Sequence, residues 1–328
     1  MHAQHVVLGD RARFTGASLG AEKVNVSLLI EQGLNGIQLG MVLFLMSAGL
    51  TLIFGVMGLL NLAHGSFYMI GAFVCAGVAA ATGSFWLGLA ASLVFAWVLG
   101  AVVEIAVIRP LYKRDHFEQA LATFALILIL SEGTRAIFGP FPLYLNIPPA
   151  LASAIELPGG IEYPAYRLGL IVVGLAVAGM LYWLIDHTRL GARIRAGQSD
   201  REMVAALGVN INMLYTVVFA LGTGLAGIGG ALIGALHSVE VGMGEPMLIL
   251  AFVVIVIAGM GSILGALVCA ILVGIVDTLG RYLLPLLFSA LIGPEYGIVI
   301  GATIASLIIY LFMSFVLLFR PKGLLGAR

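Results

Sequence analysis

The chain has 328 residues, of which 61% are hydrophobic and 10% are charged, and its mean hydropathy is +1.12. Soluble domains carry about 25% charged residues, so the composition excludes a soluble globular protein and indicates an integral membrane protein. The 16 basic and 16 acidic residues cancel, so only the positions of the charges can inform on orientation and partners.

Apolar segments of roughly 20 residues recur along the chain and predict an all-α, polytopic membrane protein. Runs such as 248–260 and 297–319 do not alternate in polarity, which excludes the strands of a membrane barrel. Ten spans are expected, over 26–47, 48–60, 64–82, 86–108, 118–138, 166–186, 211–236, 247–263, 265–284 and 297–319. Because 48–60 is short for about 30 Å of hydrocarbon, eight full crossings with partly inserted segments stay open as an alternative.

Lysine and arginine mark the cytoplasmic loops of membrane proteins. They cluster in residues 1–24, 109–114, 189–201 and 320–328, whereas segments 139–166, 237–247 and 285–297 contain neither. This asymmetry divides the chain into a cytoplasmic tail (1–24), a first transmembrane half (25–138), a periplasmic connection (139–165), a second transmembrane half (166–320) and a cytoplasmic tail (321–328). Both termini are expected in the cytoplasm.

The connection 139–165 contains six prolines and separates two sets of about five spans. An odd number of spans in each half makes the halves opposite in orientation. Residues 49–65 and 224–242 both start with Gly-Leu, have a glycine-rich middle and carry a histidine near the end. The likeness favours two inverted repeats, a transporter architecture that encloses a pathway near the middle of the membrane.

The segment NLAHGSFYMIGAF (61–73) places Asn61, His64 and Ser66 within six residues of an apolar region. An unpaired polar group in hydrocarbon costs several kcal/mol, so these side chains should point inward. Glycines at three positions could let the helix break there: Gly58, Gly65 and Gly71. One interpretation is that Asn61, His64, Gly65 and Ser66 line a substrate pathway. The alternative is that Asn61 and His64 bond across helices and only fix the packing.

Charged residues within the spans occur close to partners of opposite sign. Glu132 with Arg135 and Asp277 with Arg281 have helical spacing and can neutralise each other. Glu104 lies within about a turn of Arg109 and is expected to reach the inner membrane surface. No metal-binding spacing, GxSxG elbow or P-loop is present, so neither a catalytic nor a metal site is expected on this chain.

The loop 187–215 starts with a basic stretch that includes Arg193 and Arg195. Ser199 or Asp200 can then cap a short helix, within 197–208, that Gly208 ends. Its apolar face would consist of Met203, Val204 and Leu207. A helix of about two turns suits a groove in a partner protein better than the lipid surface.

Three segments carry a family resemblance: GLTLIFGVMGLLNLAHGSFYMIGAF (49–73), LGARIRAGQSDREMVAALGVNINMLYTVVFALGTGLAGIGGAL (190–232) and RPKGLLG (320–326). Together they resemble the permease subunits of branched-chain amino acid ABC importers, the LivH type. The similarity runs from about residue 25 onward and leaves out residues 1–24.

The resemblance implies a subunit of the bacterial inner membrane that has no cofactor of its own. It implies pairing with a second, LivM-like permease, two cytoplasmic LivG/LivF-like ATPases that bind ATP and Mg²⁺, and a periplasmic solute-binding protein. Membrane lipids surround such a subunit, and no nucleic acid is expected. Four residues look like the ATPase-docking loop of ABC permeases: Glu202, Ala205, Ala206 and Gly208. The coupling region also includes the basic stretch before them.

The solute is left open by the residues themselves. An apolar lining with few hydrogen-bonding groups would suit a branched-chain amino acid, but also another small amino acid, an amide, urea or an aromatic acid. An ion-coupled secondary transporter or a channel built from inverted repeats is the alternative function.

Overall fold

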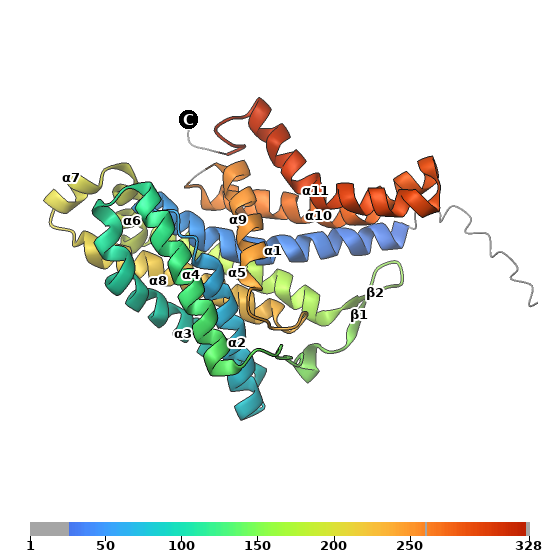
Figure 1. Cartoon of the computed structure of the whole chain (residues 1–328), viewed down its shortest axis with the longest axis horizontal. Coiled ribbons are helices and arrows are strands. Elements are labelled where there is room, and N and C mark those ends of the chain that lie inside the picture. Colours follow the sequence, from blue (N-terminus) through green and yellow to red (C-terminus); the bar gives the residue numbers. More distant parts are fainter. Residues whose placement is uncertain (1–25, 260, 326–328) are drawn as a thin grey trace, which may run out of the picture.

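The computed structural model of the chain describes residues 26–259 and 261–325. Its α-helices are α1 (Val26–Met57), α2 (His64–Thr82), α3 (Phe85–Val103), α4 (His116–Phe138), α5 (Ala165–His187), α6 (Arg189–Ser199), α7 (Arg201–Ala206), α8 (Ile211–Ile233), α9 (Gly244–Ala258), α10 (Ile263–Ile292) and α11 (Pro294–Phe319). The other elements are a π-helix η1 (Glu104–Ile108), 3₁₀-helices η2 (Arg109–Lys113) and η3 (Pro149–Leu151), and strands β1 (Ala154–Leu157) and β2 (Ile161–Pro164). The strands form one small antiparallel hairpin beside the helical bundle, so the all-α membrane fold is confirmed (Figure 1).

Among the described residues, eight helices are long and apolar enough to cross a membrane. The expectation of ten spans is wrong in two places. Residues 26–57 form one helix where two spans were predicted, because neither a proline nor a polar run interrupts its main-chain hydrogen bonds. The expected span 247–263 is the 15-residue helix α9, which ends before Gly259, a residue with a φ of 88° that glycine readily adopts. Eight long helices and the shorter α9, rather than ten full spans, therefore describe the chain.

Short elements outside the spans mark two opposite ends of the bundle, which we call the hairpin end and the α6–α7 end (Figure 1). At the hairpin end, the Tyr163 hydroxyl donates to Asn35 Oδ1 of α1 over 3.0 Å. Burial raises the pKa of Tyr163, which keeps its hydroxyl protonated as a donor. At the other end, Gly55 of α1 lies against the side chain of Gln198 in α6. Helix α1 therefore runs the whole length of the bundle.

The two segments expected outside the cell, 139–166 and 237–247, meet at the hairpin end. Leu143 and Val239 form an isolated antiparallel bridge in which each N–H donates to the other's carbonyl oxygen over 2.9 Å. Their contact agrees with the sequence-based expectation that these two segments share a side.

Helices α1–α4 and α8–α11 form two groups with matching packing. Helix α1 packs along α10, and α8 packs along α3. In each group a long helix ends in a non-helical segment, 58–63 or 234–243, and is followed by α2 or α9. Helix α1 runs toward the α6–α7 end and α8 away from it, since Leu232 near the end of α8 accepts a hydrogen bond from Tyr166 beside the hairpin. This opposite orientation supports an inverted repeat of four helices each, with α5 as the connection rather than a fifth member.

Reciprocal glycine contacts join the two groups. A Cβ on Gly49 would lie 2.4 Å from the carbonyl oxygen of Gly222, and a Cβ on Gly222 would lie 2.8 Å from that of Gly49. Gly65 of α2 and Gly244 of α9 contact each other in the same mutual way, at 2.6 and 1.9 Å. Mutual contacts of this kind are expected where two related elements meet across a two-fold axis. Only glycine lets the backbones approach this closely.

The described residues begin and end at opposite ends of the bundle. Val26 opens α1 at the hairpin end, whereas the Leu324 N–H donates to the Ile257 carbonyl oxygen over 2.7 Å nearer the α6–α7 end (Figure 1). The predicted cytoplasmic tail 1–24 lies outside the described residues. The ten expected crossings, an even number, would put both termini on the same side of the membrane. Because the continuous helix α1 replaces two predicted spans by one, the described residues instead begin and end at opposite ends.

Candidate functional site

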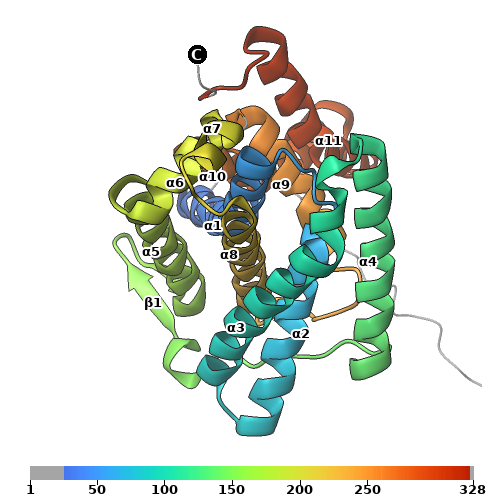
Figure 2. The same cartoon turned by 90° about the vertical axis from the view of Figure 1, so that its left-hand side faces the viewer.

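Two short helices, α6 and α7, project from the bundle after α5 (Figure 2). Thr188 caps α6 by accepting the Gly191 N–H over 3.1 Å. Asp200 caps α7 by accepting the Met203 N–H over 2.9 Å, so Asp200 is the cap and Ser199 is the last residue of α6. The extended backbone of Asp200 separates the helices, which is why the predicted single helix 197–208 is instead the end of α6 followed by α7. Gly208 has a φ of 83° and ends the segment as predicted.

The surface of α7 is largely uncovered. All predicted coupling residues are exposed, namely Arg193, Arg195, Glu202, Ala205, Ala206 and Gly208. The predicted apolar face divides in two, because Val204 is buried whereas Met203 and Leu207 are 59% and 76% exposed. Val204 therefore attaches α7 to the bundle, and Met203 and Leu207 leave an apolar surface for another molecule.

Arg195 has a second role within the chain. Its guanidinium donates to the Ile185 carbonyl oxygen and lies 3.4 Å from the Asp186 carboxylate. Both acceptors belong to the last turn of α5, where unpaired carbonyls favour a positive charge. Arg195 therefore fixes α6 against the end of α5.

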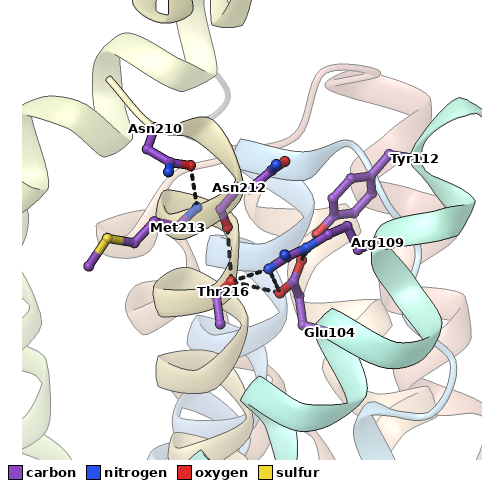
Figure 3. A network of polar contacts seen from close by, with 7 residues as sticks. All are labelled: Glu104, Arg109, Tyr112, Asn210, Asn212, Met213 and Thr216. Atoms are coloured by element: carbon purple, nitrogen blue, oxygen red, sulfur yellow. Dashed lines mark hydrogen bonds and ion pairs between the residues drawn. The ribbon is translucent and has the colours of Figure 1, made fainter. Parts of the chain in front are cut away.

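A buried carboxylate connects the first group of helices to α8 (Figure 3). Glu104 is fully buried, so the expectation that it reaches the membrane surface is wrong. It accepts hydrogen bonds from Arg109 (Nη2 to Oε2, 2.9 Å), from the Tyr112 hydroxyl and from Thr216 Oγ1 (2.7 Å). Arg109 Nη2 also donates to Thr216 Oγ1 over 2.8 Å. A buried charge requires several partners of this kind, and α8 supplies one of them.

The position of this network links it to α7. Asn210 caps α8 by accepting the Met213 N–H over 3.0 Å, and Thr216 lies in the second turn. On the other side, Glu104 begins the π-helix η1, an irregular turn of a type common at functional sites. The network thus lies between the start of α8, which follows α7 in the chain, and the end of α3. The sequence could reveal Glu104 with Arg109, but not Thr216, which lies 112 residues from Glu104.

The four residues predicted to line a pathway lie where α2 begins. Of the three glycines predicted to let the helix break, Gly58 has a φ of 66° and lies where the helix is interrupted, while Gly65 and Gly71 lie inside α2. Asn61 and His64 are fully buried and Ser66 is 4% exposed. The Asn61 side-chain oxygen accepts the Ala63 N–H over 3.1 Å.

Several polar atoms of this cluster lack a partner in the structure. Both ring nitrogens of His64, the side-chain nitrogen of Asn61 and the hydroxyl of Ser66 make no hydrogen bond to protein. The His64 ring lies beside the main chain of Met46 in α1. Each such atom costs about 1–3 kcal/mol unless water, a solute or another arrangement of the helices satisfies it.

Two pockets open at the surface near α6. One, of about 400 Å³, lies between the end of α1 and the α6–α7 junction and is lined by residues 55–58, 197–200 and 202. The other, of about 570 Å³, lies between α5 and α10. Asn61, His64, Gly65 and Ser66 line neither of them, so their role in a pathway stays a prediction.

Residues 33–317 match the family described as "Branched-chain amino acid transport system / permease component". The chain belongs to this permease family. Its membership agrees with the polytopic helical fold, and it makes the chain a permease component of an ABC import system.

Curated relatives of the permease family align with most of the chain. BraD, a high-affinity branched-chain amino acid permease protein of Pseudomonas aeruginosa, is 28% identical over 90% of this chain and 95% of its own. LivH of Escherichia coli, described in the same words, is 28% identical over the same shares. The ribose import permease RbsC of Escherichia coli is 24% identical over 71% of this chain and 72% of its own. No solved structure matches the chain.

Proposed function

We propose that this permease moves a branched-chain or closely related small amino acid across the bacterial inner membrane, driven by ATP that partner subunits bind with Mg²⁺ and hydrolyse. The observation that carries the proposal is α7, a capped helix of six residues at one end of the bundle, whose Met203 is exposed together with Leu207 directly after it. A helix this short gains little stability from its own hydrogen bonds, and a groove in another protein would bury its apolar surface. The chain itself has no catalytic role in this scheme.

The α6–α7 end is assigned to the cytoplasm. Three arginines, Arg189, Arg193 and Arg195, lie in α6, and the hairpin-end segment 139–164 contains no basic residue. Basic residues are retained on the cytoplasmic side of membranes. The C-terminal residues 321–325 are then cytoplasmic, and the hairpin end receives the solute-binding protein.

Movement of α7 would change the relation between the two groups of helices. The Glu104 network would pass the displacement from α8 to α3, and the glycine contacts at Gly49 and Gly65 would separate or slide. Opening at Gly65 and Gly244 would give the unpartnered groups of Asn61, His64 and Ser66 access to water or solute. A second permease of the same family, a LivM-like paralogue, would complete the pathway.

An ion-coupled transporter is the competing function. Such proteins use unpaired buried carboxylates as carriers of protons or cations. Among the described residues, the buried carboxylates are Glu104 and Asp277, and each bonds to an arginine, over 2.9 Å and 2.8 Å respectively. This pairing favours the ATP-driven importer.

The solute class rests on the relatives. BraD and LivH are described as branched-chain amino acid permeases, whereas RbsC is described as a ribose permease. The higher identity and coverage of the former favour an aliphatic amino acid, and the almost completely apolar bundle agrees with it.

The test is uptake of labelled leucine into proteoliposomes that hold the permease with its partner subunits and binding protein. We expect uptake only with ATP, and competition by valine and isoleucine but not by ribose or urea. Glu202→Ala should reduce both uptake and recovery of the ATPases with the permease, while Glu156→Ala, an exposed glutamate at the hairpin end, should leave ATPase recovery unchanged. Uptake that needs an ion gradient instead of ATP would overturn the proposal.

A further inference from the structure

A groove opens on the side of the bundle between α5 and α10. Its floor is α1, with Phe44 and Leu52, which are almost fully buried. Leu175 of α5 and Leu264 of α10 stand at its sides and are 52% and 60% exposed. The cavity has a volume of about 570 Å³, within the range of about 300–1,000 Å³ that is usual for ligand pockets.

The groove is only half as deep as the membrane. Its lining on α5 runs from Leu175 to Asp186, which at 1.5 Å per residue is roughly 16 Å. One leaflet of the hydrocarbon core is about 15 Å thick. At Gly174 the groove closes, because α5 packs directly on α1 there and a Cβ on Gly174 would lie 2.6 Å from Met41 Cβ. A blind groove of this depth fits the acyl chain of one leaflet and cannot hold a membrane-spanning helix of a partner.

Polar groups gather at the open end of the groove, beside α6. Arg195, Gln198 and Asp186 line it there, together with Ser262 at the start of α10. The N-terminus of a 30-residue helix attracts anions, and the Arg195 side chain is 47% exposed.

The sequence around this end is basic and aromatic. Residues 186–195 contain three arginines and one aspartate. Tyr182 and Trp183, one turn earlier on α5, are 56% and 60% exposed. Exposed Trp and Tyr rings next to basic residues are typical of the level where lipid headgroups begin.

We propose that this groove binds an anionic phospholipid. One acyl chain lies between Leu175 of α5 and Leu264 of α10, and the headgroup phosphate is bound by Arg195 and the first turn of α10. The site holds a lipid against the joint between α5 and α6, where Arg195 also contacts Ile185 and Asp186. It therefore goes beyond the proposed transport function, from which it takes only the placement of α5 and α10 in a bilayer.

The test uses the full-length permease with its partner subunits in nanodiscs of phosphatidylcholine with a minor share of phosphatidylglycerol. After transfer to mild detergent, the retained lipids are identified by native mass spectrometry. We expect phosphatidylglycerol to be enriched about tenfold over phosphatidylcholine on the wild type.

Two glycines provide a matched pair of variants. A Cβ on Gly179 would meet nothing within 4 Å, so Gly179→Leu has room for its Cβ and extends a side chain from the groove wall, and Gly133→Leu adds the same side chain to α4, where a Cβ also meets nothing. Gly179→Leu should abolish the enrichment and Gly133→Leu should keep it. Arg195→Gln should keep a bound lipid but lose the preference for the anionic headgroup.

Equal lipid retention by wild type and Gly179→Leu, or no enrichment on the wild type, would overturn the proposal. Disulfide cross-linking of Leu264→Cys to the second permease in the intact complex would do the same, since a protein would then cover the groove. ATP-dependent uptake is measured on the same samples, so that the two proposals can be distinguished. Lost uptake with normal lipid retention would count against the proposed transport function but not against the lipid site.

Discussion

Replacing Thr216 by valine removes one hydroxyl from the Glu104 network and keeps the shape of the side chain. The hydroxyl proton can go to Glu104 Oε2 at 2.7 Å or to the Asn212 carbonyl oxygen at 2.9 Å, and the charged carboxylate is the closer acceptor. A hydrogen bond to a charged group contributes about 1.5–3 kcal/mol. Because Glu104 keeps Arg109 and Tyr112, we expect Thr216→Val to lower the free energy of unfolding by about 2 kcal/mol.

Thr216→Ser is the matched control, because it keeps the hydroxyl and loses one methyl group worth about 0.8 kcal/mol. Unfolding is followed by titration with SDS in mixed micelles, and a double-mutant cycle with Tyr112→Phe measures the coupling between the two partners of Glu104. Partners in one network are coupled by about 0.5–3 kcal/mol.

The same variant tests whether the network transmits movement from α7. A loss of about 2 kcal/mol changes an equilibrium by up to roughly 30-fold, so Thr216→Val should hydrolyse ATP in the assembled complex but take up much less solute per ATP than Thr216→Ser. Equal unfolding free energies and equal uptake per ATP for the valine and serine variants would refute both parts of the reasoning.

Three further predictions concern other parts of the chain. Gly244→Ala places a Cβ 1.9 Å from the Gly65 carbonyl oxygen and should reduce the yield of folded protein, whereas Gly133→Ala, with nothing within 4 Å, should not; size-exclusion profiles compare the two. Val26→Cys should react with an impermeant maleimide from the periplasm and Lys322→Cys only after the membrane is opened, against a low background because the native cysteines are buried; labelling of both from one side would contradict the continuous crossing of α1. His64→Ala should change transport per molecule more than the amount of protein, and the reverse result would favour a packing role.

Much of the fold could be predicted because it depends on local properties. Long apolar segments define spans by themselves, and the prolines of 139–165 and the glycine at 208 mark breaks that the structure contains. The division of residues 26–57 into two spans failed because it relied on length alone. The number of crossings in a long apolar segment depends on tilt and on neighbouring helices, which no local pattern encodes.

The candidate site was predictable to a smaller extent. Asp200 and Gly208 have strong local preferences for a cap and a positive φ, so the coupling segment was found, although Asp200 divides it into two helices. Thr216 and the partners of Gly65 could not be found, because each depends on a residue more than a hundred positions away. Whether Asn61 and His64 line a pathway depends on a second arrangement of the helices.

Helix α1 is an uninterrupted rod of 32 residues, roughly 48 Å long, whose Asn35 is bound by the hairpin and whose Gly55 rests on α6. A stiff rod in contact with both membrane faces cannot shorten, so a push at one face must appear at the other as a tilt or a slide. Arrival of a loaded carrier protein outside and nucleotide turnover inside would then be sensed through a single mechanical element. A flexible insertion in the middle of α1 should therefore uncouple movements at one membrane face from movements at the other.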